Sequence, residues 1–230
     1  MSLKSRFKPI ANKIPFLGEY LRFRRTLLNS VPLKKWVKFR LGINKSVYWP
    51  VHNNSEVVGA ENIYIGKNAT LGIRPGCYIN GNGGIIMGDF ARVASNCGII
   101  SSNHDVYNHL QHIDKPIIIG DHCWVGQNSL ILAGVELGPR TIVAGGSIVT
   151  KSFPDGYCII GGNPAKLIKS LDPSLFRPMT CEEIYHGFVP ESKFSRFVDE
   201  KLSNKIKTLI NSRLKKGGGN LKAIYYGFAA

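Results

Sequence analysis

The chain has 230 residues, of which 43% are hydrophobic and 10% aromatic, which suits a folded protein with a sizeable core and excludes a disordered one. Its 30 Lys and Arg against 15 Asp and Glu give a formal net charge of +15, which favours anionic partners. Its five cysteines show neither a CxxC pair nor the spacing of a disulfide framework, so we expect reduced thiols in a cytoplasmic protein.

Residues 1–55 are predicted to form a basic, helical N-terminal segment. Residues 1–49 carry twelve Lys and Arg and one acidic residue, Glu19. Prolines break this stretch into short pieces, and apolar and basic residues alternate at roughly helical spacing. We leave two roles open, a helix packed on the main domain and a helix on a membrane surface. No signal peptide or apolar run of about 20 residues is found, so we expect a soluble protein or one peripheral to the inner face of the membrane.

Residues 56–170 contain a six-residue repeat of aliphatic residues. Its longest unbroken run is Ile119, Val125, Ile131, Leu137, Val143 and Val149, and the same pattern begins earlier with Ile65, Leu71, Val93 and Ile99. A period of six fits neither an α-helix nor a plain strand, but it fits a chain that winds through a triangular coil. The residues two positions before each aliphatic are mostly small, as a narrow interior requires. We therefore predict a mainly β fold, a parallel β-helix.

The repeat is interrupted between Ile99 and Ile119, which are twenty residues apart instead of eighteen. The polar stretch 101–116 in this interval is predicted to leave the coil as an excursion loop. Loops that project from a rigid scaffold often carry binding and catalytic residues.

Residues 171–230 are predicted to form a helical C-terminal extension. The range 191–216 has the pattern of one basic amphipathic helix, ended by Gly217. Residues 191–222 carry nine Lys and Arg against three acidic residues. As for the N-terminal segment, the excess charge fits either a solvated, packing helix face or contact with an anionic membrane or acidic glycan.

Five motifs within the coil resemble the hexapeptide-repeat acetyltransferases, most closely the branch that acetylates sugars and surface polysaccharides. They are SNHD at 102–105, KPIIIGDHCWVG at 115–126, ILAGV at 131–135, IVAGGSIVTK at 142–151 and GNPAK at 162–166. The resemblance covers under half of the chain and leaves out both basic flanks. It implies a left-handed parallel β-helix, a homotrimer, and acetyl-CoA in the groove between neighbouring prisms.

The resemblance also implies roles for individual residues. The catalytic histidine of the family falls on His104. The family's coenzyme-binding positions fall on Trp124, Ala144, Gly145, Gly146, Thr150, Lys151 and Lys166. No metal is implied.

The chemistry of these residue types agrees with such a reaction. Acetyl transfer from a thioester to a sugar hydroxyl needs a base near neutral pH, and histidine is the usual choice. Coenzyme phosphates favour Lys or Arg. Asn82 and Asn103 are candidates to orient the acceptor, although turn positions also favour asparagine, and Asp105 either aligns His104 or caps the loop. We expect a small-molecule or glycan acceptor and no nucleic acid.

Four alternatives remain. The enzyme could be an N-acetyltransferase of a nucleotide-linked amino sugar, or a scaffolding protein that kept the coil and lost catalysis. A zinc enzyme like the γ-class carbonic anhydrases would use His104 and His122 with His109 or His112. Cys97 or Cys123 could be a nucleophile, but Cys123 stands at an inward position of the repeat and is expected to pack in the core.

Overall fold

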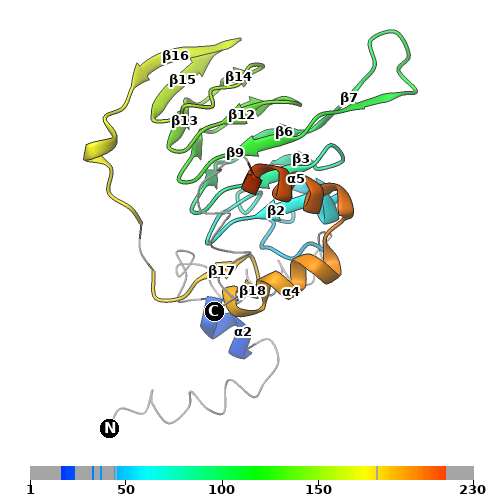
Figure 1. Cartoon of the computed structure of the whole chain (residues 1–230), viewed down its shortest axis with the longest axis vertical. Helices are drawn as coiled ribbons and strands as arrows, with labels where there is room; N and C mark the ends of the chain where they lie inside the picture. The colour runs from blue at the N-terminus through cyan, green and yellow to red at the C-terminus, as the bar shows by residue number, and fades with distance from the viewer. Residues whose placement is uncertain are drawn as a thin grey trace.

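The computed structural model describes residues 17–23, 33, 37, 44, 46–179 and 181–215. Its main body is a coil whose three walls are sheets of short strands (Figure 1). The first wall contains β1 (Glu56–Val58), β3 (Tyr78–Asn80), β6 (Gly98–Ile100), β11 (Leu130–Ile131) and β14 (Ile148–Val149). The second contains β2 (Ile63–Ile65), β4 (Ile85–Met87), β9 (Ile117–Ile119) and β12 (Glu136–Leu137). The third contains β5 (Arg92–Val93), β10 (Trp124–Val125), β13 (Thr141–Val143), β15 (Cys158–Gly162) and β16 (Ala165–Ser170).

The six-residue repeat supplies the interior of the coil, as predicted. Every aliphatic residue of the repeat is at most 3% exposed, and the residues two positions earlier are also buried. Neighbouring strands pair in parallel and in register, so that Val93, Val125 and Val143 stack above one another. The antiparallel β16, which closes the third wall on β15, is an exception. The intervening residues of each strand therefore face outward.

The corners of the coil are tight because successive turns stack backbone on backbone. At Gly120, an added Cβ would lie 2.7 Å from both the carbonyl carbon of Gly138 and the nitrogen of Pro139. A side chain at this corner would force two coils apart, which explains why glycine follows the inward aliphatic residue here.

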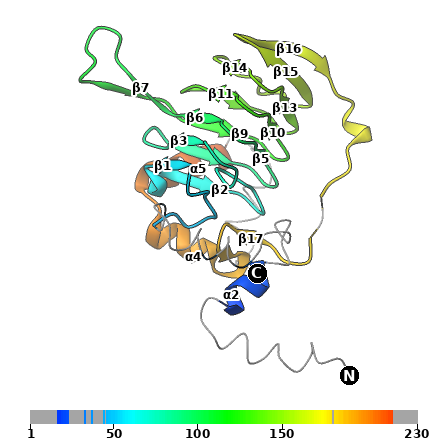
Figure 2. The same cartoon turned by 180° about the vertical axis from the view of Figure 1, so that it is seen from behind.

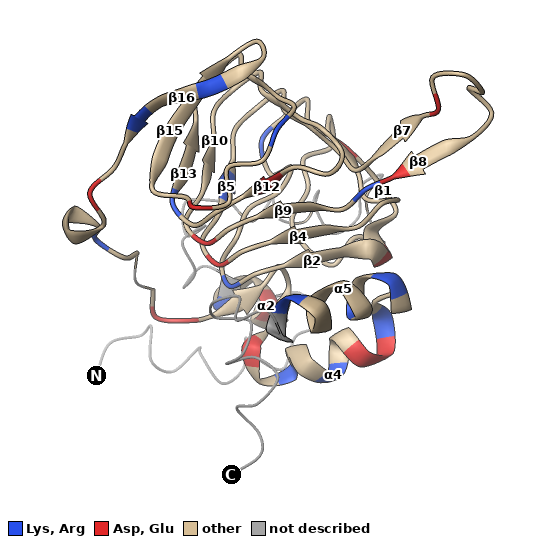
Figure 3. Cartoon of the chain, turned by 45° about the horizontal axis from the view of Figure 1, so that its top comes forward, with Lys and Arg blue, Asp and Glu red and all other residues tan. Residues whose placement is uncertain are grey.

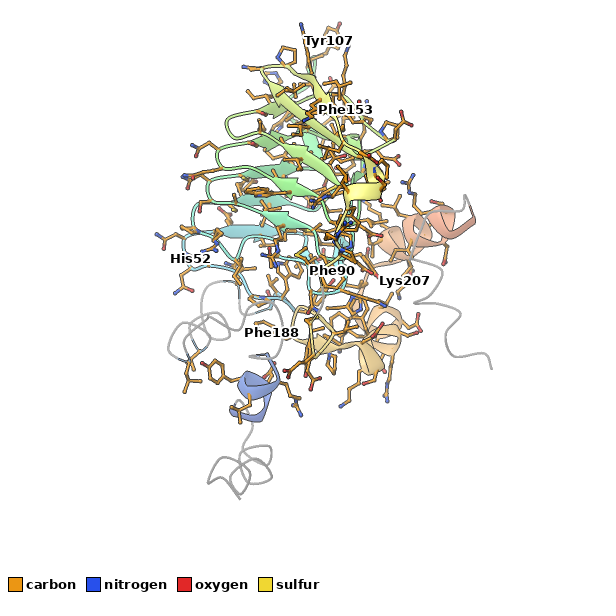
Figure 4. The ribbon with its side chains drawn as sticks, turned by 90° about the vertical axis from the view of Figure 1, so that its left-hand side faces the viewer. His52, Phe90, Tyr107, Phe153, Phe188 and Lys207 are labelled. Carbon is orange, nitrogen blue, oxygen red and sulfur yellow. The ribbon has the colours of Figure 1, made fainter. Side chains whose placement is uncertain are left out.

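The excursion predicted at 101–116 is a two-stranded antiparallel hairpin. It consists of β7 (Ser102–His104) and β8 (His112–Asp114), which project away from the coil (Figure 2). Tyr107 lies in the loop at the end of the hairpin and is 96% exposed (Figure 4). The hairpin leaves at the corner between the first and second walls, and the coil resumes at β9.

The chain returns from the last coil to the first through residues 171–190. This segment includes η2 (Pro173–Leu175), β17 (Tyr185–His186) and β18 (Val189–Pro190). Phe176 packs on His122, with ring centroids 4.8 Å apart. Farther along the segment, the side chain of Asn68 donates to the carbonyl of Glu183 and accepts from the backbone nitrogen of Tyr185. The segment thus follows one corner of the coil towards its N-terminal end.

The prediction of a single helix over 191–216 is wrong, because two helices occupy this range. These are α4 (Glu191–Lys201) and α5 (Asn204–Lys215), which lie at the N-terminal end of the coil and along its second wall (Figure 3). The helix is interrupted at Ser203 because its backbone nitrogen donates to the carbonyl of Glu61 at 2.9 Å instead of continuing the helical hydrogen bonds. The Ser203 hydroxyl donates to Asn62 at 2.6 Å, so η1 (Ala60–Asn62) holds the junction.

Aromatic residues close the N-terminal end of the coil. Trp49 is 1% exposed and its indole nitrogen donates to the carbonyl of Leu71, while Tyr48 packs edge-on against it and Phe194 packs on Tyr48. A short helix, α2 (Leu17–Phe23), belongs to the predicted N-terminal helical segment, most of which lies outside the described residues. Among the helices that the structure describes, none has the length and hydropathy to cross a bilayer.

We predict that Ile99→Ala lowers the free energy of unfolding by about 2–5 kcal/mol, because it removes a fully buried side chain and leaves a cavity. Leu175→Ala removes a comparable side chain that is exposed, and it should change stability by no more than about 0.5 kcal/mol. Chemical denaturation of both variants at one protein concentration measures the difference. Equal effects would contradict the assignment of Ile99 to the interior of the coil.

Candidate active site

His104 is the last residue of β7, where the hairpin strand holds its ring clear of the coil. Its Nδ1 lies 2.7 Å from the carbonyl oxygen of His109. A carbonyl oxygen can only accept a hydrogen bond, so Nδ1 is the nitrogen that carries the proton. In the neutral ring, Nε2 then has a free lone pair, and the side chain is exposed. The arrangement is that of a base that can accept a proton from a group arriving from solvent.

Two further histidines surround His104. The register of the hairpin places His112 directly opposite, with ring centroids 4.4 Å apart, and the His109 ring lies 6.5 Å away. His122 lies elsewhere, at a corner of the coil, with its ring stacked on Phe90 at 5.1 Å. Burial lowers the pKa of His122. Within the described residues, no group of three or more His, Cys, Asp or Glu side chains is arranged to hold a metal ion.

The three residues considered for the acceptor lie on the hairpin or at its base. Asn103 is the exposed neighbour of His104 and pairs with Ile113. Asp105 caps the loop, because its Oδ1 accepts from the backbone nitrogens of residues 107 and 108 at 2.8 and 2.9 Å. Of the two roles left open for Asp105, these contacts match the cap, and the carbonyl of His109 aligns the His104 ring instead. Asn82 lies in the turn that precedes β4, beneath the base of the hairpin.

Trp124 stands on the outer face of the third wall and is 57% exposed. Strand register aligns it with Ile142, Ile159 and, on β16, Lys169. On the other side of Trp124 the same register reaches Arg92, whose buried Nε has no hydrogen-bond partner among the described residues. An exposed aromatic residue between basic groups is suited to a flat or anionic ligand.

Ala144, Gly145 and Gly146 form the turn between β13 and β14. The Gly146 nitrogen donates to the carbonyl of Gln127 at 2.8 Å, and its φ of +74° requires a residue that tolerates the left-handed region. A Cβ added at Gly146 would meet no atom within 4 Å, so the backbone here borders open space. Lys166 on β16 stands opposite Gly161 on β15. A Cβ added at Gly161 would lie 2.9 Å from the Cβ of Ala144. The fold therefore brings Lys166 close to this turn.

Thr150 and Lys151 lie at the opposite end of β14 from Gly146, and both are exposed. These two residues lie at the corner between the first and second walls. The hairpin leaves the coil at the same corner, two coils nearer to the N-terminal end. Within one chain, the predicted residues thus fall into separate places, with Trp124 on the third wall, the Ala144 turn and Lys166 at its edge, and His104 on the hairpin. A single chain does not bring them around one point.

Neither candidate cysteine has the surroundings of a nucleophile. Cys97 and Cys123 are each 1% exposed, as expected for inward positions of the coil. Burial raises the pKa of Cys123 to about 12, and its thiol donates to the carbonyl of Gly138. A thiol with so high a pKa supplies almost no thiolate near neutral pH.

Sequence reasoning did not find several residues that the structure adds to the site. The carbonyl of His109 and the ring of His112 reach His104 only because of the hairpin register. Lys169 and Arg92 align with Trp124 only because the strands of the third wall pair in register. Lys205, on α5, contacts the hairpin across 91 residues of sequence. None of these could be located without the three-dimensional pairing.

Comparison with known proteins agrees with this architecture. The model for the hexapeptide repeat of succinyl-transferase matches residues 116–151. The putative acetyltransferase YJL218W of Saccharomyces cerevisiae is 34% identical over 122 residues, which are 48% of this chain and 57% of that protein. The 2,3,4,5-tetrahydropyridine-2,6-dicarboxylate N-acetyltransferase of Clostridium perfringens is 46% identical over 57 residues, 25% of this chain and 24% of the relative. The chain thus spans little more than half the length of the yeast protein.

The crystal structure of a maltose O-acetyltransferase from Clostridium difficile 630 superposes with a TM-score of 0.51 at 24% identity, covering 70% of this chain and 91% of that one. At this identity the likeness concerns the fold. Together with the matched repeat and the parallel walls, it confirms the predicted architecture. The coil of this chain is thus a left-handed parallel β-helix built from hexapeptide repeats.

Proposed function

We propose that the protein transfers the acetyl group of acetyl-CoA to a hydroxyl of a sugar, a surface polysaccharide or a lipid-linked glycan, with His104 as the general base. The observation that carries the proposal is the 2.7 Å contact between His104 Nδ1 and the carbonyl of His109. It fixes the tautomer whose Nε2 accepts a proton, on an exposed hairpin that an acceptor can approach. Sequence relatives named as acetyltransferases support the reaction class.

In the proposed mechanism, acetyl-CoA supplies the acyl group as an activated thioester. Nε2 of His104 takes the proton of the acceptor hydroxyl while the hydroxyl oxygen forms the new bond to the acyl carbon. The carbonyl of His109 stabilises the resulting imidazolium through the proton on Nδ1. His104 then returns the proton to the departing thiolate, so that the free thiol and the acetyl ester are the products and the histidine is neutral again. No covalent enzyme intermediate is required.

The proposed coenzyme-binding residues suit a long, thin ligand with phosphates at one end. The open backbone at Gly146 accepts close approach, and Trp124 offers an exposed apolar face. Lys166, near the Ala144 turn, provides a cation for a phosphate group. Thr150 and Lys151 lie at the far end of β14 and would contact a different part of the ligand or a neighbouring chain.

We also propose that the active unit is a homotrimer. The support is the separation of the predicted residues within one chain, since the hairpin with His104 projects away from the wall that carries Trp124 (Figures 1 and 2). A closed ring of three identical chains would set the hairpin of one chain beside the coenzyme-binding wall of the next. Each ring would then hold three equivalent sites.

His104→Ala should lower kcat by roughly 10²–10⁴-fold, the usual contribution of a positioned general base, and leave acetyl-CoA binding nearly unchanged. Lys166→Ala should instead weaken acetyl-CoA binding and leave kcat nearly unchanged, because it removes a phosphate contact. The assay measures thiol release and labelled product with a panel of sugars and glycans, after circular dichroism shows both variants folded.

The same assay separates the two kinds of acceptor, since mild alkali removes an acetyl ester and leaves the amide that an amino-sugar acceptor would give. A folded His104→Ala enzyme with normal turnover would refute the general-base role.

We further predict that the neutral His104 ring carries its proton on Nδ1. Nitrogen-15 NMR of labelled protein should show a pyrrole-type shift for Nδ1 and a pyridine-type shift for Nε2, because the carbonyl of His109 accepts from Nδ1. His112→Ala serves as the spectroscopic control for assigning the two neighbouring rings. A protonated Nε2 in the neutral ring would contradict the proposed direction of proton transfer.

A further inference from the structure

The hairpin that carries His104 is anchored at its base by backbone hydrogen bonds. The backbone nitrogen and hydroxyl of Ser101 both donate to the carbonyl of Asn80, and Lys115 donates to the carbonyl of Ser101. These bonds fix the position at which the hairpin leaves the coil. The angle between the hairpin and the coil depends on contacts made farther along the hairpin. On β8, the side chain of Asp114 contacts an element outside the hairpin.

The partner of Asp114 is Lys205, in the first turn of α5. Lys205 Nζ lies 2.8 Å from Oδ2 of Asp114 and donates to the carbonyl of Asn82 at 2.6 Å. One ammonium group therefore links the hairpin, the turn beneath it and the C-terminal helix. The hydrogen bond from Lys205 lowers the pKa of Asp114, so the carboxylate is ionised near neutral pH.

Lys205 can act as a fixed point because α5 is itself docked on the coil. Ile206 and Ile210 are at most 1% exposed, and the guanidinium of Arg213 pairs with both carboxylate oxygens of Glu136 on β12. The backbone of Lys205 is held by its nearest contacts, the buried Ile206 and the hydrogen bonds of Ser203 to Glu61 and Asn62, which do not involve Arg213. Of the two elements that this ion pair joins, the helix is docked on the coil by these contacts, so the ion pair restrains the hairpin.

Asp114 is coupled to His104 through the geometry of the hairpin. Directly opposed residues of an antiparallel pair share a face, and residues two apart on one strand do so as well. The pairs Ser102–Asp114 and His104–His112 therefore lie on the same face. A change in the tilt of β8 at Asp114 would move His112, whose ring contacts that of His104.

We propose that Lys205 is a positioning residue for the reaction, which holds the hairpin through Asp114 and Asn82 so that His104 is aimed at the acceptor. The inference rests on the proposed role of His104 as the base. It gives the C-terminal extension, which lies outside the resemblance to the acetyltransferases, a part in catalysis. The ion pair is solvent-exposed, with side chains 48% and 38% accessible, so it contributes little to global stability and acts on orientation.

The test compares Lys205→Met and Asp114→Asn with Arg213→Met in the full-length protein. Arg213→Met is the matched control, because it also breaks an ion pair between α5 and the coil but does not touch the hairpin. Lys205→Met should lower kcat roughly 10-fold, within the ~10²-fold cost of a small misplacement of a reacting group, and leave the KM for acetyl-CoA unchanged. Asp114→Asn should do the same, and the double variant should be no worse than either single one.

Two further readouts distinguish orientation from folding. Amide hydrogen exchange in residues 103–113 should increase in Lys205→Met and stay at the wild-type rate in Arg213→Met. Lys205→Arg, which keeps the charge and the donors, should restore most of the lost turnover.

Normal turnover in Lys205→Met, or an equal loss in Arg213→Met, would overturn the positioning role. Absence of acetyl transfer by the wild-type protein to every acceptor would instead overturn the proposed function, so the two failures are distinguishable.

Discussion

Inward side chains of the short strands fill the interior of the coil, each aliphatic residue of the repeat with a second buried residue two positions before it, and this packing governs the rest of the molecule. The walls are in register, so each inward residue stacks on its equivalent in the next coil, and the stacked aliphatic residues are at most 3% exposed. The buried hydroxyls of Ser129, Thr141 and Ser147 in this column donate to backbone carbonyls. Every group able to react or to bind a charged ligand must stand on an outer face, at a corner or on a segment that leaves the coil.

The distribution of the candidate residues follows from this packing. Outward positions of the third wall present Trp124 and its basic neighbours, corners expose the backbone at Gly146, and the hairpin carries His104. The rigid coil holds the first two sets in fixed positions. The hairpin is held by a few contacts at its base, and the ion pair between Asp114 and Lys205 supplements them. The C-terminal helices thus close the N-terminal end of the coil and also reach the reactive segment.

The repeat in the sequence predicted the fold well, because a period of six leaves few other architectures. It predicted which aliphatic residues would be buried and that residues 101–116 would leave the coil. The division of 191–216 into α4 and α5 was missed, since it depends on hydrogen bonds from Ser203 to η1, far away in the sequence. The alignment of His104 by a backbone carbonyl was missed for a related reason, because carbonyl groups carry no residue signature. Resemblance indicated the candidate residues and implied a groove between neighbouring chains, and the fold shows where each of these residues lies within one chain.

Because one chain keeps these residues apart, subunit complementation tests most directly whether the active site is shared between neighbouring chains. Neither His104→Ala nor a variant with both Trp124→Ala and Lys166→Ala should turn over acetyl-CoA at low concentration when assayed alone. If His104 of one chain acts at the coenzyme-binding wall of the next, trimers reassembled from an equal mixture of the two should regain activity at about one site in four, as random mixing in a closed ring dictates. A reassembled mixture that stays as inactive as its two components would contradict the shared site.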